Sequence, residues 1–275
     1  MTYQRMLMSQ KPRRTVAMML SLAGLVGCTL TVYACSSRAV AVYDASPQMM
    51  ASLTSRESGL RVGELTQSGS VSAGDIWTDK ARRDRFLRFT SGSSKPESIT
   101  RTITPEDDGS LTIELATEVT SAASGRSSLS REDSGDVVIT SNLANKIESS
   151  FEPRAIFMSS ELGAGDVVER EIGVQSKGPM FGSGKGEGTS VIRGIGTQTI
   201  ETPAGLFEAF VIESELSFSV GPARITLTQR AWIDQGETRA GIVAEEGQES
   251  VKVFGIGVHG ESRVSVLDEL RVSAD

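Results

Sequence analysis

The sequence predicts a mainly β protein, with a single antiparallel β-rich domain and one or two short helices, folded as a curved sheet, a half-barrel or a sandwich. Two observations carry this prediction. Apolar residues recur with a period of two in several segments, which places them on one face of a strand. The chain also holds 28 glycines among its 275 residues, and many of them stand in turn signals between apolar runs. We expect a signal peptide at residues 1–27, a tether at residues 28–56 and the β-rich domain at residues 57–275.

The clearest predicted strand is Glu208–Val220, where apolar side chains from Phe210 onward share one face and glutamates and serines share the other. A period of two over such a stretch excludes a helix. The segment Arg224–Ile233 follows with the same alternation, and one dry face with one wet face indicates antiparallel pairing. Further strands are expected over the segments Ser110–Val119, Asp136–Leu143, Asp166–Val174, Ser250–Phe254 and Arg263–Val266.

Turn signals separate these strands. Pro105–Gly109 and Glu132–Gly135 each precede an alternating run and end in a glycine after acidic residues, as hairpin turns do. The acidic residues of both turns are expected to be solvated. Helix signals are scarce: one candidate lies within Ala73–Phe89, and Leu267–Val272 is expected to form a short terminal turn.

The N-terminus has the organisation of a bacterial export signal. Four cations, Arg5, Lys11, Arg13 and Arg14, precede the apolar stretch, and the first acidic residue is Asp44. The apolar stretch from Val16 to Gly27 has the length of a signal-peptide core and is too short to span a bilayer. Leu25-Val26-Gly27-Cys28 is similar to the lipobox of bacterial lipoproteins. The resemblance implies diacylglycerol on the Cys28 sulfur, cleavage before Cys28 and acylation of the new amine.

Other interpretations of this segment stay open. Val32-Tyr33-Ala34 also resembles a lipobox, which makes Cys35 the alternative lipidation site, although Tyr is unusual at the middle position. Residues 16–35 together have the length of an uncleaved signal anchor. Ala39-Val40-Ala41 fits an ordinary signal-peptidase site. A disulfide between the two cysteines would lie inside the export segment and would constrain nothing in the folded domain.

Composition and the export signal together indicate a location. Thr29 follows Cys28, where Asp would mark inner-membrane retention in some bacteria. We therefore expect a lipid-anchored protein of the cell envelope that faces the periplasm, with the outer membrane favoured over the inner one. The net charge is −7, and an acidic chain repels nucleic acid phosphates, so no nucleic acid partner is expected.

Several motifs in the second half of the chain resemble a family. They are, in order, Phe151-Glu152-Pro153, Leu162–Asp166, Thr202–Ala209, Trp232 and Gly241-Ile242-Val243. This order resembles uncharacterised bacterial envelope lipoproteins with a TPAG-F strand start, a strand that ends in Trp and a Gly-hydrophobic-Val turn. The linker Asp234–Ala240 is longer and more charged than that pattern. The resemblance implies a periplasm-facing antiparallel domain, as in curved half-barrels that hold lipid or lipoprotein, and it supplies no catalytic residues.

Two motifs hint at chemistry and fit it poorly. Gly182–Gly188 suggests a phosphate loop, but Pro179 stands where that motif requires Gly and Gly186 where it requires Ser or Thr. We expect a flexible loop between strands there. His259 is the only histidine, which excludes a multi-histidine zinc site, and we expect a solvated or capping turn residue. No catalytic, metal-binding or cofactor-binding residue is assigned, and no cofactor is expected.

A basic segment interleaves with aromatic residues: Lys80, Arg82, Arg83, Arg85 and Arg88 with Phe86 and Phe89. We expect a charged helix face over an aromatic edge, with contact to anionic lipid headgroups or an acidic envelope partner as the functional alternative.

The favoured function is therefore a membrane-anchored lipoprotein whose non-catalytic domain binds an apolar or envelope ligand. The alternative is a structural or protein-interaction component of the envelope, and a carboxylate-dependent hydrolase is the least favoured. A core without a cavity of ligand size, ~300 Å³ or more, would favour the alternative.

Overall fold

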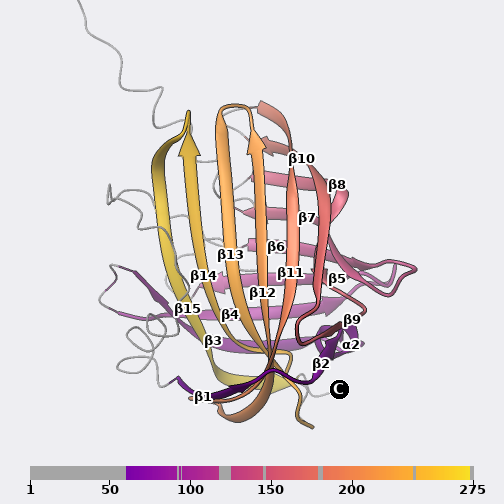
Figure 1. Cartoon of the computed structure of the whole chain (residues 1–275), viewed down its shortest axis with the longest axis vertical. Helices are drawn as coiled ribbons and strands as arrows, with labels where there is room; N and C mark the ends of the chain where they lie inside the picture. The colour runs from indigo at the N-terminus through magenta and orange to yellow at the C-terminus, as the bar shows by residue number, and fades with distance from the viewer. Residues whose placement is uncertain are drawn as a thin grey trace, which may run out of the picture.

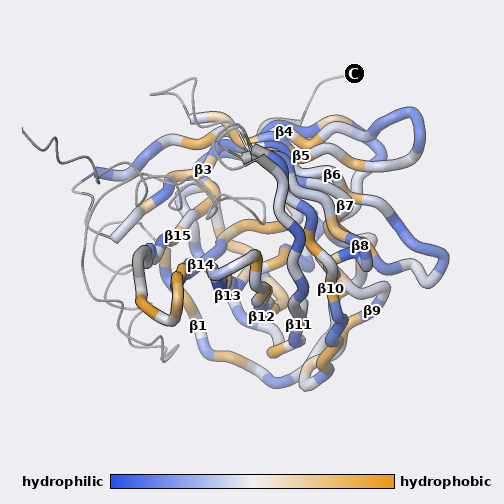
Figure 2. The backbone as a smooth tube through the Cα atoms, turned by 90° about the horizontal axis from the view of Figure 1, so that it is seen from above, coloured by the Kyte–Doolittle hydropathy of each residue, from blue (hydrophilic) through white to orange (hydrophobic). Residues whose placement is uncertain are grey.

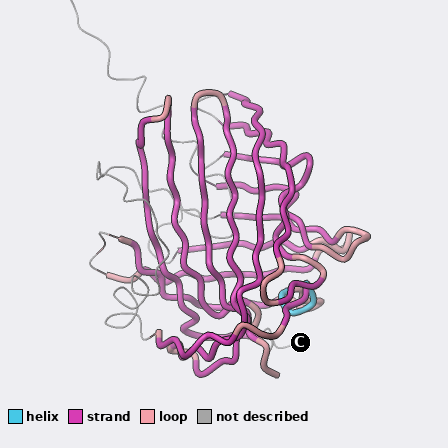
Figure 3. Tube along the Cα trace, in the orientation of Figure 1, coloured by secondary structure: helices cyan, strands magenta, loops and turns pink. Residues whose placement is uncertain are grey.

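The structure is a computed structural model that describes residues 60–91, 93, 95–117, 125–144, 147–178, 182–237 and 240–272. The predicted signal peptide, the tether and both cysteines, Cys28 and Cys35, lie outside these residues. Figure 3 shows that nearly all of the described chain is strand, with one short helix beside it. The predicted mainly β, antiparallel fold class is thereby confirmed.

The elements follow one another in chain order. They are β1 (Arg61–Thr66), β2 (Ser70–Ser72), α2 (Ala73–Ile76), β3 (Arg82–Thr90), β4 (Glu97–Pro105), β5 (Leu111–Thr117), β6 (Gly125–Arg131), β7 (Val137–Ala144), β8 (Ile147–Met158), β9 (Glu161–Gly163), β10 (Val167–Gly178), β11 (Gly182–Thr202), β12 (Gly205–Val220), β13 (Ala223–Asp234), β14 (Ile242–Val253) and β15 (Ile256–Val272).

One 13-stranded antiparallel sheet holds all of these strands except β2 and β9, which pair with each other. Its order is β1-β11-β10-β8-β7-β6-β5-β4-β3-β15-β14-β13-β12, and β12 also pairs with β11. This last pairing closes the sheet into a barrel, to which β1 is added along β11. The predicted shapes were a curved sheet, a half-barrel or a sandwich, and the structure shows a curved sheet that closes completely.

The barrel is flattened into two layers that cross each other. In Figure 1 the long strands β10–β15 run lengthwise in front, and β3–β8 run across behind them. Figure 2 shows the ring of strands from above. Register irregularities between Gly194 and Gly196 in β11 and between Leu267 and Glu269 in β15 interrupt the ladders and let these long strands bend.

Apolar side chains pack in two clusters on opposite faces of the lengthwise layer. The larger one fills the space between the layers and includes Phe210 and Ile212 of β12. The smaller one gathers around Trp232 and includes Val211, so both faces of β12 are buried at this point. The predicted face of Glu208–Val220 is correct, because Phe210, Ile212, Leu216, Phe218 and Val220 all belong to the larger cluster in the interior.

The short helix expected within Ala73–Phe89 is present as Ala73–Ile76, but the rest of that range is not helical, and Arg82–Thr90 forms β3. The inward-facing residues of β3 are Asp84, Phe86 and Arg88. Because two of these three are charged, the sequence does not show apolar residues at every second position. Leu267–Val272 is not a terminal turn but the end of strand β15, paired with β3. Nowhere in the described ranges is there a helix long and apolar enough to cross a membrane.

Candidate functional site

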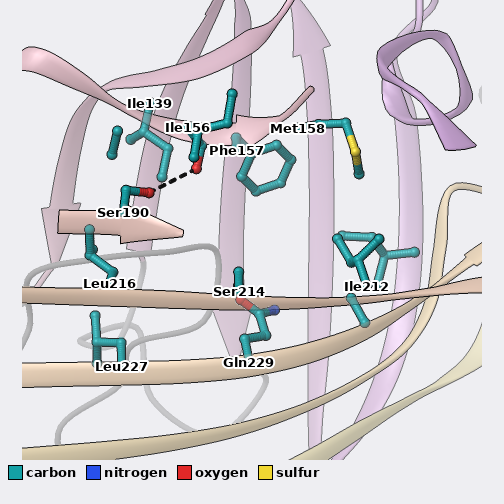
Figure 4. A pocket seen from close by; sticks show the side chains of 13 residues that line it. Ile139, Ile156, Phe157, Met158, Ser190, Ile212, Ser214, Leu216, Leu227 and Gln229 are labelled. Carbon is teal, nitrogen blue, oxygen red and sulfur yellow. Dashed lines mark hydrogen bonds between the residues drawn. The ribbon is translucent and has the colours of Figure 1, made fainter. Parts of the chain in front are cut away.

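A cavity between the two layers of the barrel is the first candidate site (Figure 4). Ile156 and Met158 of β8 approach it from the crosswise layer, and Ile212, Leu216 and Leu227 from the lengthwise layer. The Ser190 hydroxyl donates a hydrogen bond to the Ile156 carbonyl at 3.3 Å, which joins the two layers at the cavity wall. The cavity is therefore mainly apolar, as expected for the interior of such a barrel.

The volume of this cavity limits what it can hold. It measures about 70 Å³, which is room for a few water-sized molecules at ~10–15 Å³ each. Binding sites for small molecules and cofactors occupy ~300–1,000 Å³. A ligand of that size therefore does not fit in this cavity as it stands.

A polar side chain, Gln229, lies between the cavity and a cluster of buried charged residues. Gln229, which lines the cavity, donates from Nε2 to Glu245 Oε2 at 3.0 Å. Glu245 also lines a second hollow of only about 10 Å³, which it shares with Arg88 and Ser265. Cross-strand pairing explains this meeting, because Ser265 of β15 lies opposite Glu245 of β14 and opposite Arg88 of β3.

Arg263 and Glu249 extend this cluster along β14. Arg263 pairs with Gly247, and its Nε lies 3.4 Å from the position that a Cβ of Gly247 would occupy. The glycine thereby leaves room for a guanidinium between the side chains of Glu245 and Glu249, which share its face. We call Arg88, Glu245, Glu249 and Arg263 the interior charge cluster; each is less than 10% exposed.

Burial shifts the protonation of two members of the cluster. Removal from water raises the pKa of Glu249 to about 8, the Glu261 charge adds to the shift and Arg263 opposes it. Removal from water, with help from Arg263, lowers the pKa of Arg88 to about 10, although Glu245 and other carboxylates oppose this. Glu249 is therefore largely uncharged at neutral pH. Its Oε1 is buried and accepts no hydrogen bond from any described residue.

A carboxyl group with a raised pKa beside an arginine is a common arrangement in active sites. Carboxylate-dependent hydrolysis also needs space for a substrate between the acid and its partner. The hollow beside Glu245 and Arg88 offers about 10 Å³, which holds at most one water molecule. We therefore interpret the interior charge cluster as a structural network of the barrel wall.

The predicted basic segment is dispersed by strand β3 and forms no continuous patch. Asp84 is fully buried and accepts hydrogen bonds from Arg82 Nε at 3.0 Å and from Arg101 Nη2 at 3.1 Å. The Arg101 guanidinium also lies 4.4 Å from the Phe86 ring centre and donates to the Ile242 carbonyl. Desolvation, followed by the nearby Arg101 charge, lowers the pKa of Arg82, and Asp84 opposes the shift.

The other cations of that segment point elsewhere. Arg85 forms ion pairs with Asp268 at 2.6 Å and with Glu269 at 3.2 Å, and Arg88 belongs to the interior charge cluster. Lys80 and Arg83 remain exposed. The expected charged helix face is therefore wrong, because alternate residues of a strand face opposite sides of the sheet.

The glycine-rich stretch Gly182–Gly188 is also not the expected loop. It forms the first part of β11, where it pairs with β10 throughout and with β12 from Gly186 onward. A Cβ on Gly188 would lie 2.1 Å from the Ser217 carbonyl oxygen, so the backbone of β12 occupies the space of a side chain. The glycines thus permit the close approach of β12 to β11, and the stretch is a strand rather than a phosphate-binding turn.

The remaining predicted features agree with the structure only in part. The acidic turns precede β5 and β7 as expected, and Asp108 is exposed. Asp136 beside the second turn is nevertheless buried and forms an ion pair with Arg170. The backbone of His259 belongs to β15 rather than to a turn, and its side chain is not among those described. Among the described side chains, no group of metal-ligating residues occurs.

The motifs of the family resemblance are positioned as turns and core. Thr202–Gly205 forms the turn from β11 to β12, with Gly205 at φ 142°. The Trp232 side chain is 1% exposed, and its Nε1 donates to Gln198 Oε1 at 3.0 Å. The Asp234 carboxylate closes the charged linker by accepting from the backbone amides of Gly236 and Ala240. These motifs stabilise the fold and assemble no reactive group.

Comparisons with known proteins add little to this picture. No family model matches the chain, and no curated protein matches it. One solved structure, from Bacteroides fragilis and described as an exported protein with a YmcC-like fold, aligns at 12% identity over 70% of this chain and 97% of its own, with a TM-score of 0.43. Another, from Parabacteroides distasonis and described as a lipoprotein, aligns at 11% identity over 72% and 98%, with a TM-score of 0.35. The predicted family membership stays a prediction.

Proposed function

We propose that this chain is an exported envelope lipoprotein, anchored through Cys28, whose barrel acts through its outer surface as an interaction module. The observation that carries the second part is the small volume of the cavity between the layers. A cavity of about 70 Å³ is well below the ~300 Å³ of a small-molecule site. By the criterion set from the sequence, this favours the interaction component over the enclosed-ligand protein.

The anchor rests on the sequence of the N-terminal segment, with Cys35 as the alternative site. The apolar core of the signal ends in a lipobox-like sequence, and an acidic domain follows. A periplasm-facing position at the outer membrane is the favoured location. The partners of such a module are the membrane that holds the anchor and an envelope component that meets the barrel surface.

A second candidate function keeps the interior as a binding site for the end of an apolar chain. The observation that favours it is the apolar wall of the cavity, in which Ile156, Ile212 and Leu216 face one another from both layers. Such a ligand would have to separate the layers before it could enter.

Mass spectrometry of the native protein, extracted with mild detergent, tests both parts. We expect a mature chain that begins at Cys28 and carries acyl groups, without a stoichiometric apolar ligand. An unprocessed chain beginning at Met1 would contradict the lipoprotein proposal. A lipid that co-purifies in a one-to-one ratio would favour the second candidate, and a chain beginning at Cys35 would move the anchor to the alternative site.

A further inference from the structure

The hairpin between β14 and β15 ends in an exposed apolar tip. Phe254 is 78% exposed and Ile256 is 70% exposed, and they flank Gly255 at the turn. We call Phe254, Gly255 and Ile256 the hairpin tip. The backbone amide of Phe254 donates to the Pro222 carbonyl at 3.1 Å, so the tip is tied to the neighbouring β12–β13 turn. The exposed side chains are therefore presented by a supported hairpin, at the upper end of the barrel in Figure 1.

The backbone at the tip disfavours the residue that occupies it. Phe254 has φ 51° and Gly255 has φ 79°, and Phe254 is the one residue other than glycine with positive φ among those described. Two-residue hairpin turns with positive φ at both positions strongly prefer Asn, Asp or Gly at the first. A bulky aromatic residue there is strained. The turn thus keeps an exposed aromatic side chain at a position where a smaller polar residue would be more stable.

The charges beside the tip show a second unfavourable arrangement. Arg224 of β13 lies directly opposite Lys252 of β14, and the other neighbours of this pair are Ser219 and Gly257. Like charges opposite each other destabilise a sheet. Neither cation forms an ion pair with any described carboxylate. Two uncompensated positive charges therefore stand next to the exposed apolar tip.

We propose that the hairpin tip enters the interface of an anionic lipid bilayer, with Phe254 and Ile256 in the boundary between headgroups and acyl chains. Arg224 and Lys252 then bind lipid phosphates, which removes their mutual repulsion. An aromatic and an aliphatic side chain beside cations is the combination that binds such interfaces. This inference rests on the proposed surface-acting lipoprotein and names the surface that the barrel contacts.

The tether is long enough for the lipid anchor and the hairpin tip to reach the same membrane. The chain from Cys28 to Leu60 holds ~30 residues, and at up to ~3.6 Å per residue it can extend to roughly 100 Å. The 16 residues of β12, at ~3.3 Å each, measure about 50 Å along the barrel. A lipid attached at Cys28 can therefore stay in the same membrane that the tip meets, whichever end of the barrel the tether leaves.

Tryptophan fluorescence of the full chain in vesicles tests the contact. Phe254→Trp places a reporter at the tip, and Leu206→Trp is a matched control, because Leu206 is 71% exposed at the opposite end of β12. The extracted chain is reconstituted into phosphatidylcholine vesicles with or without phosphatidylglycerol, and with bromine-labelled acyl chains as quencher. The signal of the two native tryptophans is subtracted with the unmodified chain.

In the anionic vesicles we expect a blue shift of the F254W emission and severalfold stronger quenching for F254W than for L206W. The quenching of F254W should be weaker in vesicles of phosphatidylcholine alone. It should also be weaker when Arg224→Ser and Lys252→Ser are combined with it. Equal or absent quenching of the two reporters would overturn the proposal and leave a groove on a protein partner as the site that binds the tip.

Flotation of the same samples with the vesicles separates the lipid-anchor proposal from the tip-contact proposal. If the chain floats but F254W is not quenched, the lipid anchor is supported and the membrane contact of the hairpin tip is contradicted. If F254W is quenched in an unprocessed chain, the tip contact is supported and the lipoprotein proposal is contradicted.

A second pair of changes guards against loss of folding. Phe254→Asn with Ile256→Thr removes the apolar surface, and Asn suits the positive φ of the turn. We expect this double variant to unfold at the same or a higher temperature than the unmodified chain. A tryptophan that replaces Ile256 then serves as the reporter. We expect it to be quenched much less when Phe254 is replaced by Asn than when Phe254 is present. Undiminished quenching would contradict a role for the Phe254 ring.

Discussion

Glu249 shows how a single buried carboxyl group can be tolerated within a β sheet. It lies beside Arg263 and opposite Glu261, and removal from water dominates its titration. The folded protein therefore stabilises the protonated form, which needs no counter-charge. Arg263 can then interact with Glu245 on the other side of Gly247, so the interior charge cluster is more nearly balanced than its formal charges indicate.

Replacing this group should change how stability depends on pH. The pKa of Glu249 is raised from 4.5 to about 8 in the folded protein, so between these values the folded state binds a proton that the unfolded state has lost. Stability is therefore fully present below pH 4.5 and is lost as the pH rises toward 8, by up to about 1.4 kcal/mol per pH unit. Glu249→Gln should remove this loss and be more stable than the unmodified protein near pH 8.

Urea unfolding between pH 5 and pH 8.5 measures this effect. Glu106→Gln is a suitable control, because it makes the same chemical change at an exposed residue in the turn before β5, outside the interior charge cluster. If Glu249→Gln falls in stability with pH as steeply as the unmodified protein, the carboxyl group titrates without a raised pKa and the account of the cluster is wrong.

The buried charges were beyond sequence reasoning for a physical reason. Glu245-Glu246-Gly247-Gln248-Glu249 has the composition of a solvated segment, yet in β14 its odd positions face the barrel interior. Charged residues are buried only where partners reach them from other strands. Those partners, Arg88 and Arg263, are distant in the sequence, and only the strand order places them beside β14.

At the scale of elements, the glycines of β11 decide how closely three strands approach. Gly188 lies between Ile172 of β10 and Phe218 of β12. Strands with side chains at such a position would be held apart by the Cβ atom. Here the Ser217 carbonyl oxygen stands only 2.1 Å from the position a Cβ would take, so β12 cannot approach β11 this closely with any other residue at this position.

Gly188→Ala should therefore destabilise the protein strongly, by about 2 kcal/mol or more, since the contact is with backbone and cannot be relieved by a side-chain rotation. Gly257→Ala in β15 is the matched control, because no atom lies within 4 Å of its would-be Cβ. That change should be neutral or stabilise by ~0.4–1 kcal/mol through the unfolded state. Thermal unfolding of both variants measures the difference, and equal melting temperatures would show that β11 does not approach β12 as described.

The elements that sequence patterns predicted well are those with one dry and one wet face. Glu208–Val220 and Arg224–Ile233 correspond closely to β12 and β13, because their alternation reports burial directly. The basic segment ending at Phe89 failed because Asp84 and Arg88 occupy inward positions. The glycine-rich stretch failed because Gly suits both a loop and a crowded strand, and the single sequence does not distinguish these environments.

For the whole molecule, closure is the property that the sequence could not supply. The alternating faces predict a curved antiparallel sheet, but the pairing of β11 with β12 as well as β10 makes it a barrel. Closure leaves no unpaired edge on that ring and fixes the interior volume. The volume then determines whether the barrel holds a ligand or only its own side chains, and hence which of the two proposed functions applies.

Filling the interior cavity distinguishes these functions in the intact protein. Ala231 is 3% exposed and lines the cavity of about 70 Å³. Ala231→Val adds two methyl groups, and burial of each contributes ~0.8 kcal/mol where space is free. If the cavity is an unoccupied packing defect, the variant should be more stable by about 1 kcal/mol in urea unfolding.

The same variant should leave the surface functions of the protein unchanged. We expect its flotation with anionic vesicles and the quenching of a tryptophan at position 254 to equal those of the unmodified chain, because the hairpin tip lies on the outside of the barrel. A native ligand in the cavity would give the opposite result, since the added methyl groups would displace it. In that case Ala231→Val would lower stability in cell extracts, and a lipid found with the unmodified chain would be missing from the variant.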